Sequence, residues 1–464
     1  MRRPPSAVPR ALALALSTAL ARGPLAAQPP APRIVVTPGP ALLAGDSAGV
    51  RVTGLPPHAE VELTAERLVG APGRRAVWAS RARYAADGAG VVDLARSAPL
   101  GGSSYAGADA AGLFWSMTPE PGDTAGRRPG EVRLAARVAN REVARAAVLL
   151  RASDPAVRVD SVPGFPGAVF AVPPAAPGTP PRRLPTLVVL GGSEGGASTA
   201  RSMAPRLASR GYAVLGLPYY APAWGGPSEF PTLPAGFVDI PVDRLDSARA
   251  WLAGRPEVDS SRMGIYGVSK GAEFALLAAA RSLWVRAVVA VAPTDVVWEG
   301  WGPGAGTGRA SSFAVGGRAL PFVPYAGMDS VQARIARGEA VGIRVAHDAG
   351  RRAHPAAAAA ARIPVERYGG ALLVIGGDAD QVWASGPMAR AIAARRARAG
   401  RRTTLLAFPA AGHALSGDGW GPTTGYGPGL GGKPAGNARA QREAWGTTLR
   451  FLARELGGQG TAGR

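Results

Sequence analysis

Residues Met263–Ala280 read MGIYGVSKGAEFALLAAA, and this stretch decides how the chain folds. A short apolar run at Ile265–Tyr266 leads into a turn at Gly267–Gly271, and an Ala/Leu-rich segment follows. A strand, a tight turn with serine at its apex and a helix are the context in which G-x-S-x-G forms a nucleophile elbow. Glycines flank the serine because a Cβ would clash in so sharp a turn. The stretch therefore predicts Ser269 as a nucleophile; the alternative is a glycine-punctuated strand–helix corner with an incidental serine.

On both sides of this stretch, predicted strands alternate with predicted helices, which indicates a mostly parallel sheet. Residues Glu299–Arg362 interrupt this rhythm with Gly-rich, aromatic and poly-Ala segments and are expected to form an excursion near the site. We expect residues 158–464 to form this α/β domain. Its predicted strands are Val162–Val172, Thr186–Leu190, Tyr212–Leu217, Val285–Val291, Ala371–Ile375 and Thr403–Phe408, and its predicted helices are Ser198–Arg210, Val242–Gly254, Pro387–Arg398 and Ala438–Leu456.

The preceding part of the chain has a different pattern, and 464 residues give room for two domains. Residues 32–152 contain short alternating runs separated by Pro, Gly, Asp and Asn, which predict a β-sandwich or barrel. An apolar block at Leu113–Met117 lies in a Gly-rich loop and is expected to cover part of the neighbouring domain. The predicted strands are Arg33–Thr37, Gly49–Thr53, Glu60–Ala65, Arg75–Ala82, Gly90–Leu94, Val132–Val138 and Glu142–Leu150.

The N-terminus has the pattern of a secretory signal. Arg2, Arg3 and Arg10 precede the apolar run Ala11–Ala21, and small residues follow, with cleavage expected after Ala21 or Ala27. The apolar run is too short to favour a stable membrane span, although an uncleaved anchor is the alternative. We therefore expect residues 1–27 to be a signal peptide and the protein to be exported to the periplasm or the extracellular space. The chain has no cysteine, so an exported product relies on its hydrophobic cores and not on disulfides.

The formal net charge of +21 resembles that of a nucleic-acid-binding protein. However, only Lys270 and Lys433 are lysines, and the arginines are spread along the chain. There is no zinc-finger spacing, heptad-backed basic region or aromatic–basic motif, the features that accompany nucleic-acid recognition. We therefore expect no nucleic-acid partner and no stable membrane insertion. The positive field is expected to steer anionic molecules toward the surface.

A glycine cluster, Gly191–Gly196, lies between a predicted strand and a predicted helix. It lacks the G-x-G-x-x-G and G-K-S/T spacings of nucleotide-binding loops, and the strand Tyr212–Leu217 ends without an acid that could hold a ribose. In a serine hydrolase with this order of elements, the same loop supplies the second oxyanion N–H, beside the amide that follows the nucleophile. We therefore assign the backbone amides of Lys270 and Ser193 to the oxyanion hole.

A nucleophilic serine needs a histidine base, which is expected last in the chain order Ser, Asp/Glu, His. His413 follows the strand Thr403–Phe408 directly, and Gly412 allows close approach. His413 is therefore the candidate base. The remaining histidines are assigned no catalytic role, since one lies in the β-rich part and two are expected to be exposed in the excursion: His58, His347 and His354.

Two aspartates are candidates for the acid that orients His413. Asp378 and Asp380 both follow the buried strand Ala371–Ile375, at the strand end where sites of α/β proteins gather. Aspartates are also common as turn-forming residues at such places. Position favours Asp380, which lies further out, and Asp378 is the reserve.

A set of stretches spread over nearly all of the chain after the leader shares one resemblance: Gly88–Pro121, Ile265–Leu277, Leu320–Pro321, Ile363–Glu366, Asp380–Ser385 and Phe408–His413. Through them the chain resembles the acyl-coenzyme A thioesterases and bile acid-CoA:amino acid N-acyltransferases. The resemblance implies an N-terminal β-sandwich followed by a C-terminal α/β-hydrolase domain, and a triad of Ser269, Asp380 and His413.

The resemblance implies hydrolysis of acyl thioesters, because amino-acid transferases of this family typically carry Cys where this chain has Ser269. An acyl-serine ester that water intercepts gives the free acid. No metal or organic cofactor is expected, since there is no Cys and no H-E-x-x-H. The expected export leaves open oxygen esters or amides, as in a secreted carboxylesterase, a dienelactone-hydrolase-like enzyme or a peptidase. An acyl-CoA:amino acid N-acyltransferase and a non-enzymatic protein that binds its ligand through the β-sandwich also stay open.

Overall fold

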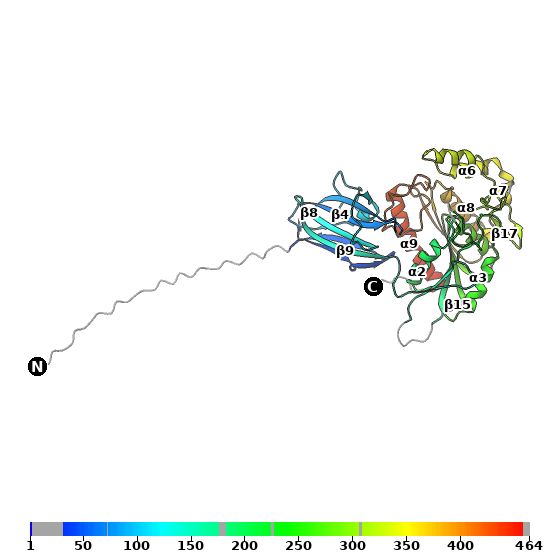
Figure 1. The fold of residues 1–464 in the computed structure, drawn as a ribbon, viewed down its shortest axis with the longest axis horizontal. Helices are drawn as coiled ribbons and strands as arrows, with labels where there is room; N and C mark the ends of the chain where they lie inside the picture. Colours follow the sequence, from blue (N-terminus) through cyan, green and yellow to red (C-terminus); the bar gives the residue numbers. More distant parts are fainter. Residues whose placement is uncertain (2–30, 72, 176–181, 224–226, 306–308, 458–464) are drawn as a thin grey trace.

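The computed structural model describes residues 1, 31–71, 73–175, 182–223, 227–305 and 309–457. Apart from Met1, the predicted signal peptide lies outside the described residues. Figure 1 shows two lobes: a smaller one formed by the N-terminal part of the chain (blue to cyan) and a larger one formed by the rest (green to red). Among the described residues, no helix is long and apolar enough to cross a bilayer.

The smaller lobe consists of two β-sheets that share one hydrophobic core. In the part of the chain that the structure describes, one sheet has the order β1-β3-β6 and the other β2-β9-β8-β4-β5-β7. Buried and less buried residues alternate along β4, as expected for a sheet with one covered face. The elements are β1 (Arg33–Thr37), β2 (Ala41–Leu43), β3 (Gly49–Thr53), β4 (Glu60–Val69), β5 (Ala76–Ala85), β6 (Val92–Asp93), α1 (Gly112–Trp115), β7 (Thr118–Glu120), β8 (Glu131–Val138) and β9 (Arg141–Arg151).

The larger lobe is built on a sheet with the order β10-β11-β13-β12-β15-β16-β19-β20, as far as the structure describes it. Neighbouring strands are parallel throughout the part β13-β12-β15-β16-β19-β20. At the other edge, β11 pairs antiparallel with β13, and β10 pairs antiparallel with β11. The strands are β10 (Arg158–Ser161), β11 (Val169–Val172), β12 (Leu184–Leu190), β13 (Ala213–Gly216), β15 (Val258–Val268), β16 (Val285–Val291), β19 (Ala371–Gly377) and β20 (Thr403–Phe408).

Helices cover both faces of this sheet, because successive strand residues point into two different cores. One core contains residues of α3 (Arg244–Ala253), α4 (Lys270–Ala279) and α8 (Ser385–Arg398). The other contains residues of α2 (Ser198–Ala208) and α9 (Pro434–Leu456). A doubly wound parallel sheet behind a β-sandwich confirms the predicted fold class.

One predicted strand is wrong. The stretch Val162–Val172 is not continuous: β10 ends at Ser161, the chain turns, and β11 begins at Val169. Gly164 and Gly167 make this turn possible, since both have positive φ angles, of 79° and 71°. The apolar residues on both sides of the turn belong to two antiparallel strands.

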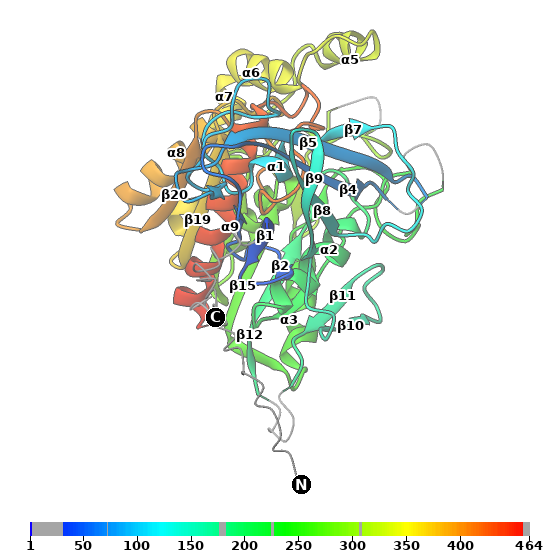
Figure 2. The ribbon, with the colours of Figure 1, turned by 90° about the vertical axis from the view of Figure 1, so that its left-hand side faces the viewer.

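The excursion after β16 contains short elements and not only loops. In the excursion, β17 (Phe313–Val315) and β18 (Arg318–Ala319) form a small sheet with β14 (Ile240–Pro241), which comes from the segment before α3. Helices that lie together at one end of the molecule follow (Figure 2). These are α5 (Met328–Ala336), α6 (Arg344–Ala353) and α7 (Pro355–Ala360), and a 3-10 turn, η1 (Val365–Arg367), leads to β19.

The apolar block Leu113–Met117 lies where the two lobes meet. Its first part belongs to α1, and Leu113, Phe114 and Met117 are fully buried in the sandwich core. That core also contains Trp420 and Ala438 from the larger lobe. The block therefore packs against the neighbouring lobe, as its composition suggested.

Candidate active site

The nucleophile candidate lies in the sharp turn between β15 and α4. Ser269 has φ 56° and ψ −120°, a conformation that L-residues rarely adopt outside functional sites. The flanking glycines are sterically required: a Cβ on Gly267 would lie 2.2 Å from the Gly271 carbonyl oxygen, and one on Gly271 would lie 2.3 Å from the Gly191 carbonyl oxygen. The local sequence therefore enforces a turn that places Ser269 at the end of a parallel strand.

The three residues predicted to act together lie in hydrogen-bonding contact. The Ser269 Oγ is 2.9 Å from His413 Nε2, and His413 Nδ1 is 2.8 Å from Asp380 Oδ2. They come from the turn after β15, the loop after β20 and the loop after β19, all at the carboxyl ends of parallel strands. An imidazole between a serine hydroxyl and a carboxylate can accept the hydroxyl proton while the carboxylate holds its other nitrogen.

The carboxylate of Asp380 is completely buried and fixed by its own loop. Oδ1 accepts hydrogen bonds from the amides of Val382 (2.8 Å) and Trp383 (3.3 Å), and Oδ2 accepts one from the Ser385 hydroxyl (2.5 Å). The side chain thus has one orientation, in which Oδ2 faces His413.

Asp378 is directed elsewhere. Its two carboxylate oxygens form a bidentate ion pair with the Arg390 guanidinium, at 2.7 Å each. This partner lowers the pKa of Asp378. The two candidate acids therefore have different partners: Asp380 contacts His413, and Asp378 pairs with an arginine of α8.

The glycine cluster 191–196 lies beside Ser269, because a Cβ on Gly192 would be 3.1 Å from the Ser269 Cβ. The Gly192 amide donates to Glu194 Oε1 at 3.0 Å, and the amides of Gly195 and Gly196 donate to backbone carbonyls. Ser193 is exposed, and none of the hydrogen bonds found among the described residues uses its amide. Lys270 is the first residue of α4, so its N–H precedes the first intrahelical bond. The oxyanion roles of Lys270 and Ser193 stay predictions.

A buried ion pair begins at Lys270, the residue after Ser269, and it was not predicted from the sequence. The Lys270 ammonium lies 2.6 Å from Glu273 Oε2 and donates to the Ser312 hydroxyl at 2.9 Å. Glu273 Oε1 accepts the Trp298 amide at 3.2 Å. Burial lowers the pKa of Lys270 and raises the pKa of Glu273. The ammonium also faces three aromatic rings, those of Phe237, Trp301 and Phe313. The i, i+3 spacing of Lys270 and Glu273 was the one feature of the sequence that indicated the ion pair.

His347, predicted to be exposed in a loop, is buried on helix α6 with 2% exposure, so that prediction is wrong. Its ring packs edge-on against Trp298, Tyr325 and Trp383, and Trp383 in turn contacts the His413 ring at 5.2 Å between centroids. Burial lowers the pKa of His347 to about 4. Helix α6 thus carries a neutral histidine into an aromatic cluster next to the candidate base. Of the remaining histidines, His58 is exposed and His354 half-buried.

Arginines near both ends of helix α6 bind loops that follow strands of the large sheet. The Arg344 guanidinium donates to the carbonyl oxygens of Asp380 (2.9 Å) and Asp378 (3.1 Å). At the other end of the helix, Arg351 forms an ion pair with Asp295, which follows β16. This part of the excursion therefore packs on the loop after β19 that contains Asp378 and Asp380, which we call the acid loop.

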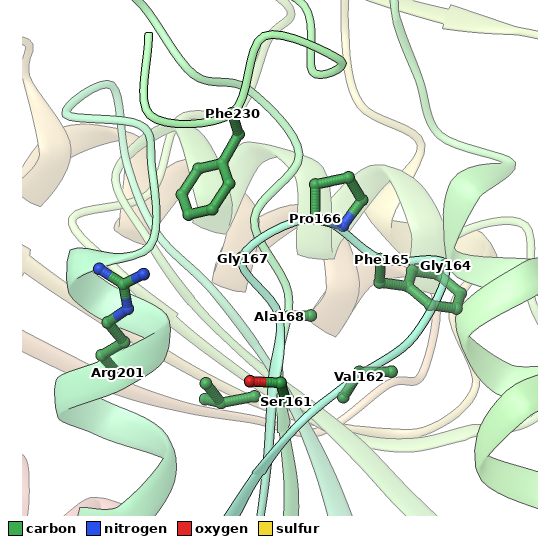
Figure 3. Close-up of a pocket in the computed structure, with 10 residues that line it drawn as sticks. Ser161, Val162, Gly164, Phe165, Pro166, Gly167, Ala168, Arg201 and Phe230 are labelled. Atoms are coloured by element: carbon green, nitrogen blue, oxygen red, sulfur yellow. The ribbon is translucent and has the colours of Figure 1, made fainter.

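The described residues contain no group of three His, Cys, Asp or Glu side chains that could hold a metal ion. A surface pocket of about 380 Å³ lies between the β10–β11 turn, α2 and Phe230 (Figure 3). None of the predicted site residues lines it, and the charge of its Arg201 is paired with Glu229 at 2.6 Å. The pocket is therefore separate from the candidate active site.

Comparison with known proteins gives two family matches. Residues 46–153 match the acyl-CoA thioester hydrolase/BAAT N-terminal region, and residues 240–458 match the BAAT/acyl-CoA thioester hydrolase C-terminal model. The chain is 27% identical to acyl-coenzyme A thioesterase 6 of Mus musculus over 435 residues, which cover 88% of this chain and 93% of the relative. It is 28% identical to acyl-coenzyme A thioesterase 1 of Rattus norvegicus over 434 residues, with the same coverage. It is also 27% identical to acyl-coenzyme A amino acid N-acyltransferase 2 of Rattus norvegicus over 461 residues, which cover 91% and 98% of the two chains.

Proposed function

The chain belongs to the family of acyl-CoA thioester hydrolases and bile acid-CoA:amino acid N-acyltransferases, and from this premise we propose that it hydrolyses acyl thioesters with Ser269, His413 and Asp380 as its catalytic triad. The observation that carries the proposal is the continuous chain of contacts from Ser269 Oγ through His413 to Asp380, at 2.9 and 2.8 Å. Ser269 also lies in a strained turn, directly before the first residue of α4 and next to the glycine cluster 191–196.

In the first half of the reaction, Ser269 Oγ attacks the thioester carbonyl carbon while His413 Nε2 accepts the hydroxyl proton. The tetrahedral intermediate collapses with cleavage of the C–S bond, and His413 returns the proton to the departing sulfur, so that a thiol leaves and an acyl-serine remains. In the second half, His413 accepts a proton from water, which attacks the ester. The second tetrahedral intermediate collapses with cleavage of the C–Oγ bond, and His413 returns the proton to Ser269 Oγ, so that the carboxylic acid leaves and the serine hydroxyl is restored.

Asp380 supports both halves by accepting the Nδ1–H of His413, which leaves Nε2 free to receive a proton. Its buried carboxylate also stabilises the imidazolium that forms when His413 takes up the proton. The amides of Lys270 and Ser193 are proposed to bind the oxyanion of each tetrahedral intermediate.

A serine nucleophile favours hydrolysis over transfer to an amino acid. The acyl-serine formed here is an oxygen ester, whereas a cysteine nucleophile would keep the acyl group as a thioester that amines attack more readily. The chain has no cysteine at any position. Water is therefore the proposed acceptor.

The decisive experiment is a substrate panel. The purified enzyme is assayed with acyl-CoA thioesters and 4-nitrophenyl esters of increasing acyl length, with Ser269→Ala as the control. We expect thioester hydrolysis that this substitution lowers by several orders of magnitude while the fold is kept, as for loss of a triad nucleophile. A Ser269→Ala variant that turned over the preferred substrate at the wild-type rate would show that another residue is the nucleophile.

We propose, in addition, that residues up to about Ala27 are removed and that the mature protein acts outside the cytoplasm. The support is the arginines followed by an apolar run and small residues at the N-terminus. Export favours oxygen esters as a second substrate class, because coenzyme A thioesters are chiefly cytosolic. N-terminal sequencing of the protein recovered from cell fractions of its host tests this; a cytosolic protein that begins at Met1 would contradict it.

A further inference from the structure

A glycine-rich segment connects the candidate base to helix α9. Residues 414–433 read ALSGDGWGPTTGYGPGLGGK, with eight glycines among twenty residues. Glycine loses more conformational freedom on folding than any other residue, so such a segment has little intrinsic order. Contacts with other parts of the molecule are therefore expected to contribute much of its order.

One side of this segment contacts the catalytic loops. The Leu430 carbonyl accepts the His413 amide at 2.8 Å, and Gly431 forms a β-bridge with Asp380. The two backbones are closely packed, because a Cβ on Gly412 would lie 2.2 Å from the Gly431 carbonyl oxygen. The stretch 430–432 therefore lies between the acid loop and the loop after β20 that contains His413, which we call the histidine loop. Its position helps to fix the distance between the two loops.

The other side of the segment is held by the β-sandwich. The Trp420 ring packs edge-to-face on Phe114, with 5.0 Å between ring centroids, and is only 8% exposed within the sandwich core. The Trp420 carbonyl also accepts a hydrogen bond from the Arg67 guanidinium at 3.3 Å. Trp420 thus anchors the segment in a core that belongs to the other lobe.

Backbone contacts continue from this anchor. The Thr423 amide donates to the Trp115 carbonyl at 3.0 Å, and the Thr424 hydroxyl donates to the Met117 carbonyl. A Cβ on Gly425 would lie 2.6 Å from the ring of Trp78, so the segment is pressed against the sheet of the sandwich as well. Several groups from α1, β4 and β5 therefore order residues 420–425, five positions before the stretch that touches His413.

We propose that the β-sandwich is a working part of the active site: it orders the 414–433 segment and thereby positions His413 against Asp380 and Ser269. Trp420 is the main positioning residue, although it does not contact the reacting atoms, and Thr424 is a second. The proposal rests on the proposed triad. It assigns the N-terminal lobe a role in the rate of the chemical step.

The test compares three variants with the wild-type enzyme. Trp420→Ala removes the anchor and is expected to lower kcat by about tenfold to a hundredfold, because displacements of about 1 Å cost this much in positioned catalytic groups. KM is expected to change little if Trp420 acts on the position of His413 and not on substrate binding. Trp420→Phe keeps an aromatic ring on Phe114 and is expected to restore most of kcat. Thr424→Val, which is isosteric, is expected to lower kcat less than Trp420→Ala and serves if that variant does not fold.

The matched control is Val52→Ala, which removes buried volume from the same core on β3. Its melting temperature is expected to fall, whereas its kcat at a temperature where it is folded is expected to match wild type. The proposal is overturned if Trp420→Ala and Thr424→Val keep the wild-type kcat, or if Val52→Ala loses as much kcat as they do.

A second readout separates this proposal from the proposed function. The rate at which a fluorophosphonate probe labels the enzyme depends on the Ser269–His413 pair and not on the natural substrate. Slower labelling of Trp420→Ala, restored in Trp420→Phe, supports the positioning role even if no thioester is hydrolysed. Equal labelling rates for wild type and Trp420→Ala count against it even if thioesters are good substrates.

Discussion

Replacing Lys270 by methionine tests the energetic role of the buried ion pair that follows Ser269. The two charges lie 2.6 Å apart and neither side chain is more than 1% exposed. At an effective dielectric constant of 20, this separation corresponds to an attraction of about 6 kcal/mol. Most of that attraction is offset by the cost of removing both charges from water, so the intact pair contributes little net stability.

Breaking the pair has a different cost. Methionine preserves the length and the apolar stem of Lys270 but leaves Glu273 buried with only the Trp298 amide and no counter-charge. Loss of one partner of a buried pair typically costs about 3–5 kcal/mol. We expect Lys270→Met to lose stability in this range, and the double variant Lys270→Met/Glu273→Gln to recover most of it, because glutamine is neutral and still accepts the Trp298 N–H.

The assay is urea unfolding at pH 7, followed by circular dichroism and tryptophan fluorescence, for wild type, both single variants and the double variant. If the two lobes unfold in separate phases, the phase of the larger lobe gives the comparison. The double-mutant cycle then isolates the coupling between the two side chains. This account of the pair would be refuted if Lys270→Met lowered the free energy of unfolding by less than about 1 kcal/mol and the double variant were no more stable than Lys270→Met.

Three further predictions concern the site and its surroundings. Asp380→Asn is expected to lower kcat by about 10³–10⁴, as for the orienting acid of serine proteases, while Asp378→Asn keeps nearly all activity because its carboxylate faces an arginine on α8; steady-state kinetics of both variants decide between them. Burial lowers the pKa of His347 to about 4, below its unfolded value of about 6.5, so its stabilising effect is complete above pH 6.5 and is lost as the pH falls toward 4. Between pH 7 and pH 5 this loss of stability amounts to about 2 kcal/mol. In urea unfolding at both pH values, the free energy of unfolding of His347→Phe is expected to fall correspondingly less than that of wild type. Gly192→Ala is expected to lower kcat by about tenfold or more without unfolding the protein, because the new Cβ would lie 3.1 Å from the Ser269 Cβ; unchanged kcat would show that this loop does not crowd the nucleophile.

The fold was predictable where the hydrophobic period is simple. The strands β1, β3, β16 and β20 have the predicted bounds, since each is a short apolar or alternating run between turn residues. The β10–β11 hairpin was missed because apolar residues on both sides of Gly164 and Gly167 read as one run. A pattern of residue types does not by itself say whether a glycine interrupts a strand or turns it.

The proximity of the three candidate residues follows from the order of the strands. Ser269, Asp380 and His413 each follow a strand of one parallel sheet, and the carboxyl ends of such strands meet at one edge. The burial of His347 was not predictable, because it depends on how an excursion without a regular period packs. The contact between Lys270 and Ser312, 42 positions apart, likewise follows from tertiary packing alone.

The burial of Lys270 has a practical consequence for chemical labelling. The chain contains two lysines and no cysteine, and folding encloses the Lys270 ammonium, so Lys433 carries the one lysine amine that a reagent can reach. Lys433 is exposed at the end of the glycine-rich segment, and its amide donates to the Ala410 carbonyl at 3.0 Å. An amine-directed fluorophore, with the N-terminus blocked, would therefore attach at a single defined place next to the histidine loop. Its anisotropy would report how firmly that loop is held, without any engineered attachment site.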